Sequence, residues 1–138
     1  MTDEQLVEYF EAGDEPPGGF HHPEHVRVAW WYARREPWPL ALHRFQAAVR
    51  RFAAARGKPE RYHETITAAF MVLVQERLDA DGARDLSWDE FASRNADLLE
   101  WNPSILDRRY LPGTLSSERA RRIFVLPDGG GGDDRGVR

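Results

Sequence analysis

The chain has 138 residues, a formal net charge of -4 and no cysteine, which excludes disulfides, thiolate metal sites and cysteine nucleophiles. This length predicts one domain that can bury its own core, and a content of 41% hydrophobic and 30% charged residues is typical of globular proteins. The acidic balance argues against a nucleic-acid partner, because binding a duplex normally needs a concentrated basic face.

No apolar run approaches the roughly 20 residues that cross a bilayer, so we expect no membrane association. The first five residues lack the basic and apolar regions of a signal peptide, and we therefore expect a cytoplasmic location. Basic pairs occur along the chain at Arg34-Arg35, Arg50-Arg51, Arg108-Arg109 and Arg121-Arg122. Solvated helix faces account for such pairs more readily than phosphate or RNA binding does.

The first predicted helix begins at Thr2, where Gln5 three residues later completes a capping box, and it ends at Gly13. The segment 14–19 cannot continue this helix, because its two prolines remove backbone donors and its two glycines favour a turn. It is a loop that leads into the first of two histidine patches.

Three further helices follow this loop. Pro23 suits the first turn of a helix that ends before the prolines at 37 and 39. The next helix ends at Gly57 and carries apolar residues at steps of three and four, namely Leu42, Phe45, Val49 and Phe52. Residues 66–78 are apolar on nearly all sides, which predicts a helix at the centre of a bundle.

Shorter elements are expected in the last third of the chain. Ser87 and Glu90 form a second capping box, and the helix that they begin is expected to extend to Leu98 and Leu99. Asn102-Pro103 predicts a short turn, and a last helix is expected over about residues 117–124.

The predicted fold is all-α, because no run alternates cleanly enough to indicate a strand. We expect a single-domain bundle of about five to six helices over residues 1–127. The Gly/Asp-rich segment 128–138 has nothing to bury and is predicted to be a disordered tail.

Four of the five histidines lie in two patches, residues 21–25 (HHPEH) and 62–65 (YHET), each at the start of a predicted helix. Imidazole is the side chain that most readily serves as a metal ligand or a proton carrier near pH 7. Helical spacing puts His22, His25 and His63 on the buried sides of their helices. If the two helices run parallel, with the intervening helix running back, both patches meet at one end of the core.

This convergence predicts a metal site with His22, His25 and His63 as ligands and Glu64 as the fourth ligand or the catalytic general base. Nitrogen and oxygen ligands alone do not separate Zn²⁺, Fe²⁺, Mn²⁺ and Ni²⁺. A zincin is unexpected, because Thr67 stands where that motif has its second histidine.

Structural roles compete with these assignments. A histidine at a helix start can cap the helix or pack as a hydrogen-bonded core residue, and we prefer a structural role for His21 and His43. Glu24 and Glu64 can each stabilise a helix dipole from the first turn. Several buried imidazoles nevertheless need several partners, and one metal ion supplies a partner for all of them.

Three stretches of the chain resemble a family of short, uncharacterised bacterial proteins: residues 20–30, 62–67 and 115–122. The resemblance spans most of the chain and keeps the patterns H-x-x-H and Y-H-E-T. These patterns correspond to His22, His25, His63 and Glu64 and leave His21 outside. The resemblance supports the choice of residues and implies no activity.

The leading hypothesis is a small helical metalloprotein, a metal-dependent enzyme that acts on a small molecule by hydrolysis or oxygen chemistry. Two alternatives stay open. One is a metal-free pocket for acid-base catalysis or for an anionic small molecule. The other is a non-enzymatic partner-binding or regulatory domain that uses the arginine faces and the tail. The substrate and the oligomeric state do not follow from the sequence.

Overall fold

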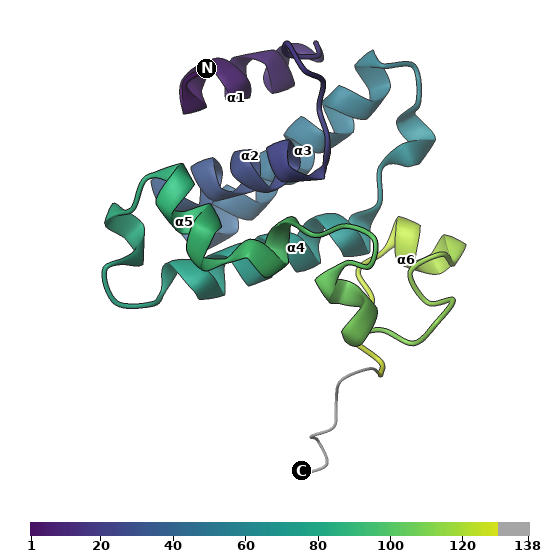
Figure 1. Ribbon diagram of the computed structural model, residues 1–138. Coiled ribbons are helices and arrows are strands. Elements are labelled where there is room, and N and C mark those ends of the chain that lie inside the picture. The colour runs from purple at the N-terminus through teal and green to yellow at the C-terminus, as the bar shows by residue number, and fades with distance from the viewer. Residues whose placement is uncertain (130–138) are drawn as a thin grey trace.

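The computed structural model describes residues 1–129, and in that range the chain forms helices and no strand, as an all-α bundle (Figure 1). The α-helices are α1 (Asp3–Ala12), α2 (His22–Arg35), α3 (Trp38–Ala55), α4 (Glu64–Leu78), α5 (Trp88–Arg94) and α6 (Glu118–Arg122). The 3₁₀ helices are η1 (Pro59–Arg61), η2 (Ala83–Asp85), η3 (Ala96–Leu99) and η4 (Ile105–Arg108). The all-α prediction is confirmed, and none of these helices is long and apolar enough to cross a membrane.

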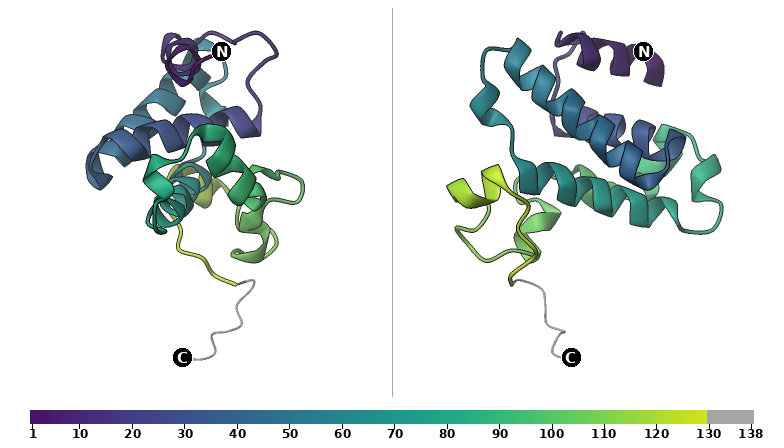
Figure 2. Two further views of the ribbon diagram at one scale, coloured as in Figure 1. Left: turned by 60° about the vertical axis from the view of Figure 1, so that its left-hand side comes forward. Right: turned by 180° about the vertical axis from the view of Figure 1, so that it is seen from behind.

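The helix α4 lies between the pair formed by α2 and α3 and the later elements η2, η3 and α6, and α1 packs on the other side of that pair (Figure 1, Figure 2). The helix α3 follows α2 in the chain and runs in the opposite direction. The helices α2 and α4 therefore start at the same end and run in the same direction. The segment that contains η4 and α6 lies beside the N-terminal end of α4. This order places both histidine patches at one end of the bundle.

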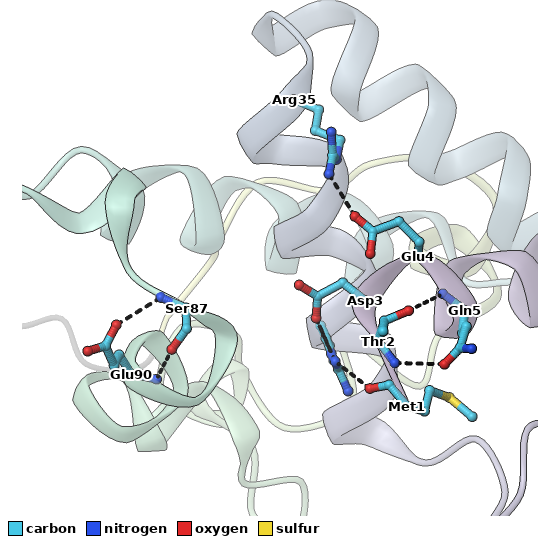
Figure 3. A network of polar contacts seen from close by, with 9 residues as sticks. Met1, Thr2, Asp3, Glu4, Gln5, Arg35, Ser87 and Glu90 are labelled. Atoms are coloured by element: carbon cyan, nitrogen blue, oxygen red, sulfur yellow. Dashed lines mark hydrogen bonds and ion pairs between the residues drawn. The ribbon is translucent and has the colours of Figure 1, made fainter.

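Two helix starts use the capping chemistry that the sequence predicts (Figure 3). The Gln5 N–H donates to the Thr2 hydroxyl at 3.1 Å, and the Thr2 N–H donates to the Gln5 side chain at 2.9 Å. Ser87 and Glu90 make the same exchange at 3.2 and 3.0 Å. Each box satisfies backbone N–H groups that have no partner within the helix, which fixes where α1 and α5 begin.

The apolar helix predicted at the centre of the bundle is α4. Its residues 68–71 are all buried, so every side of the helix contacts other parts of the core. The largest fully buried side chains from the surrounding elements include Trp30 of α2, Phe10 of α1 and Phe91 of α5. Burial of each such side chain stabilises the fold by about 2 kcal/mol, so these side chains hold the helices of the bundle together.

The fifth helix is shorter than its capping box and apolar residues predict. It ends at Arg94, and residues 98–99 lie in η3 instead. The Asn95 side-chain amide donates to Phe91 O at 2.9 Å, and Arg77 of α4 donates to the Asn95 side-chain oxygen at 2.9 Å. These contacts hold Asn95 outside helical geometry, which a local sequence pattern does not reveal.

The predicted tail begins inside the described part of the chain. Asp128 accepts hydrogen bonds from the Leu111 N–H at 2.8 Å and from the Thr114 hydroxyl at 2.6 Å. Asp128, the first residue of the predicted tail, is therefore bound to the segment between η4 and α6. Residues 130–138 of that tail lie outside the described residues.

Candidate functional site

Histidines from both patches line one cavity of about 780 Å³. His21, His22 and His25 come from the start of α2, and His63 is the N-cap of α4. The two patches therefore meet, because α2 and α4 start at the same end of the bundle. Apolar side chains form most of the remaining wall: Phe20, Val26, Ala29, Phe45, Val49, Ile66, Phe70, Leu99, Trp101 and Leu115.

Both ring nitrogens of His63 have backbone partners. Nδ1 accepts a hydrogen bond from the Ile66 N–H at 3.0 Å, so this nitrogen carries no proton. Nε2 lies 2.6 Å from Leu115 O and donates to it, because a carbonyl oxygen can only accept. Burial, together with the nearby charge of Arg121, lowers the pKa of His63 below its usual value. The imidazole is therefore neutral at pH 7 and holds α4 against the segment between η4 and α6.

His22 is held by one backbone bond and two aromatic contacts. Its Nε2–H donates to Leu98 O at 2.9 Å. The ring centre lies 4.8 Å from the rings of both Phe70 and Trp101. Burial lowers the pKa of His22, and the bond to Leu98 offsets only part of this effect. His22 is neutral at pH 7, and its Nδ1 has no partner among residues 1–129.

His25 lies among three phenylalanine rings. Its ring centre is 5.0 Å from Phe20, 5.5 Å from Phe10 and 6.1 Å from Phe52. Burial, with the neighbouring histidines of the same patch, lowers the pKa of His25 to about 4. No hydrogen bond joins its imidazole to another group in residues 1–129. At pH 7 His25 is a neutral polar group without a partner in the cavity wall.

Glu64 does not line this cavity. Its carboxylate accepts hydrogen bonds from the Tyr62 hydroxyl at 2.6 Å, the Gln46 amide at 2.9 Å and the Arg50 guanidinium at 3.3 Å. Burial and the bond to Glu64 raise the pKa of the Tyr62 hydroxyl. The position of Glu64 thus joins α4 to α3, and it gives no support to a role as the general base beside the histidines.

The four predicted ligands do not fit a metal site in this arrangement. His63 has no free lone pair, and the Glu64 carboxylate faces other partners. Within residues 1–129, no group of three or more histidine, aspartate or glutamate side chains is placed to hold an ion. A zinc, iron, manganese or nickel ion held by all four residues stays a prediction, and it requires both His63 and Glu64 to change partners.

The sequence pattern did not indicate two arginines that line the cavity, Arg61 of η1 and Arg121 of α6. Arg61 directly precedes the second histidine patch, so a search for cations next to the patches could have found it. Arg121 belongs to a basic pair that the sequence assigns to a solvated helix face. Only the fold brings it to His63, since it comes from the last helix of the chain.

Replacing His63 by alanine is expected to lower the free energy of unfolding by about 1–2 kcal/mol, because α4 loses its N-cap and Leu115 O loses its donor. His63→Asn is the matched control, since asparagine caps helices well and should restore about half of the loss. Urea unfolding at pH 7 measures both variants. Equal stability of His63→Ala and the wild type would contradict the structural role.

Comparison of the chain with protein-family models, curated proteins and solved structures finds no match. The family resemblance of the histidine patches therefore adds no activity.

Proposed function

We propose that the cavity binds a small molecule that has an apolar or aromatic body and one anionic group. The main support for this proposal is that the His25 imidazole, which lines the cavity, is neutral at pH 7 and has no hydrogen-bond partner among residues 1–129. The His25 side chain is only partly buried, so a molecule in the cavity can reach its ring nitrogens. A ligand atom that bonds to His25 supplies the missing partner.

The cavity has the size and lining of a small-molecule site. Such sites typically occupy about 300–1,000 Å³ and combine hydrophobic walls with a few polar groups. Phe70 and Trp101 supply flat apolar surface here, and neutral imidazoles supply the polar atoms. The Trp101 side chain is 51% exposed, so it lies where the cavity meets solvent. A ring system that enters the cavity can therefore stack on Trp101.

The charges around the cavity favour an anion. Arg61 and Arg121 line it, and no carboxylate from residues 1–129 does. Because His22, His25 and His63 are neutral at pH 7, the two guanidinium groups are the fixed charges of the lining. Guanidinium binds a carboxylate through two parallel hydrogen bonds, so an acid is favoured over a neutral molecule or an amine.

Binding is favoured over acid-base catalysis by the same histidines. A general base works best when its pKa is near the working pH, and a pKa of about 4 makes His25 a weak base at pH 7. His63 cannot accept a proton without losing the bond that caps α4. These side chains are therefore suited to hold a ligand by hydrogen bonds rather than to transfer its protons.

Calorimetric titration with 2-naphthylacetate and 2-(2-naphthyl)ethanol tests the proposal, because these probes share an aromatic body and differ in charge. We expect the acid to bind about tenfold more tightly than the alcohol at pH 7. Arg61→Gln is expected to reduce this difference, because Arg121 remains, and to change the affinity for the alcohol little. Arg119→Gln is the matched control, since Arg119 is exposed on α6 outside the cavity.

Failure of both probes to bind would contradict the proposed function. Equal affinities for the acid and the alcohol in the wild type would contradict the preference for an anion. The ring signals of His25 in NMR spectra provide a second measurement, since the bound probe should shift them more than it shifts those of the exposed His43.

A divalent metal is the second candidate, because His22 and His25 each keep a ring nitrogen without a partner in residues 1–129. Both imidazoles are neutral at pH 7, as metal ligands must be. Zn²⁺ added to metal-free protein should then shift the NMR signals of both rings, and His25→Ala should abolish the effect. Unchanged ring signals at a large excess of Zn²⁺ would reject this candidate.

A further inference from the structure

A second groove lies beside the histidine cavity, with a volume of about 820 Å³. Its lining comes mainly from the region of η1 and from α6: Arg50, Ala54, Pro59, Glu60, Arg61, Tyr62, Glu118, Arg121 and Arg122. A hydrogen bond from Arg121 to Glu60 O at 3.2 Å joins the two elements. The groove therefore depends on the same tertiary contact that brings α6 to the cavity.

The groove and the cavity share two lining residues, Arg61 and Arg121. A guanidinium group has five N–H donors in one plane and can bind groups on more than one edge. A molecule that occupies the cavity and contacts these arginines can extend past them into the groove. The two spaces are therefore neighbours.

The groove is basic, because four arginines line it against Glu60 and Glu118. Arg50 is already engaged, since it pairs with Glu64 at 3.3 Å and its guanidinium lies 4.4 Å from the centre of the Tyr62 ring. The remaining three arginines make no ion pair with any carboxylate of residues 1–129: Arg61, Arg121 and Arg122. Three guanidinium groups are thus available to a ligand.

We infer that the ligand of the cavity is a phosphate ester, whose phosphate lies in the groove against Arg61, Arg121 and Arg122. This inference rests on the proposed function and names its ligand class, an apolar or aromatic body with a phosphate at one end. A phosphate dianion offers three charged oxygens, and the arginine fork binds such oxygens in pairs. Three available arginines match a dianion better than they match the single charge of a carboxylate.

Three probes with one naphthyl body test this inference by calorimetry at pH 8, where a phosphate ester is a dianion. The probes are 2-(2-naphthyl)ethanol, 2-naphthylacetate and 2-(2-naphthyl)ethyl phosphate. We expect the phosphate to bind at least about tenfold more tightly than the acetate. Arg122 lines the groove and not the cavity, so Arg122→Ala should remove this advantage and leave the affinity for the acetate unchanged.

Arg119→Ala is the matched control, because Arg119 is exposed on the same helix and lines neither space. Equal affinities for phosphate and acetate, or an advantage that persists in Arg122→Ala, would overturn the inference and leave the proposed function intact. No binding by any naphthyl probe would overturn both. Inorganic phosphate is the fourth probe, and an affinity equal to that of the naphthyl phosphate would overturn the link between groove and cavity.

Discussion

Replacing Thr65 by valine is expected to lower the free energy of unfolding by about 2–3 kcal/mol, because the backbone groups of Ile123 and Val125 that bond to its hydroxyl lose their partner. Thr65 is completely buried at the start of α4. Its hydroxyl donates to Ile123 O at 2.8 Å and accepts from the Val125 N–H at 3.0 Å. Valine fills the same volume and can do neither, so the effect isolates the hydroxyl group.

Urea unfolding of Thr65→Val and of the control Thr65→Ser measures this effect. Serine keeps the hydroxyl and loses one methyl group, so we expect it to retain most of the stability. Hydrogen exchange of residues 118–125 should quicken in the valine variant, because these residues lose their attachment to α4. A valine variant as stable as the serine variant would show that the hydroxyl does not hold the segment.

Acidification from pH 7 to pH 5 is expected to lower the free energy of unfolding by about 2 kcal/mol through His25 alone. The pKa of His25 is about 4 in the folded chain and near its usual value of 6.5 in the unfolded chain. Above pH 6.5 the imidazole is neutral in both states and pH has no effect through it. Between pH 6.5 and 4 the unfolded state binds a proton that the folded state does not, so stability falls.

His25→Phe tests this assignment, because phenylalanine suits the surrounding aromatic rings and cannot bind a proton. Urea unfolding at pH 7 and pH 5 should show a smaller loss of stability for this variant than for the wild type. His22 and His63 also have lowered pKa values, so part of the loss should remain. His43→Gln on the exposed side of α3 is the control and should keep the full loss. Equal losses in His25→Phe and the wild type would contradict the burial of His25 as a neutral group.

The second histidine patch joins α4 to distant parts of the chain. His63 bonds to Leu115 O, and Thr65 bonds to the backbone at Ile123 and Val125. Glu64 bonds to side chains of α3. The residues that suggest a set of metal ligands in the sequence therefore mainly make tertiary contacts. Those contacts bring Leu115 and Arg121 of α6 to the cavity wall.

Much of the fold is predictable because its signals are local. Capping boxes at Thr2 and Ser87 satisfy backbone donors within four residues, so the sequence alone locates the starts of α1 and α5. The apolar pattern of residues 66–78 likewise places α4 at the centre without knowledge of its neighbours. The early end of α5 was not predictable, because Arg77 of another helix binds Asn95.

The sequence by itself determined that the protein is an all-α bundle, and the inward spacing of His22, His25 and His63 indicated the cavity to which all three contribute. Only the tertiary structure decided what those imidazoles can do. A ring nitrogen bonds to an ion, a ligand or a backbone carbonyl with similar geometry, and the carbonyls of Leu98 and Leu115 come from distant segments. Burial by such segments also sets the pKa of each histidine, so charge and free lone pairs are properties of the fold.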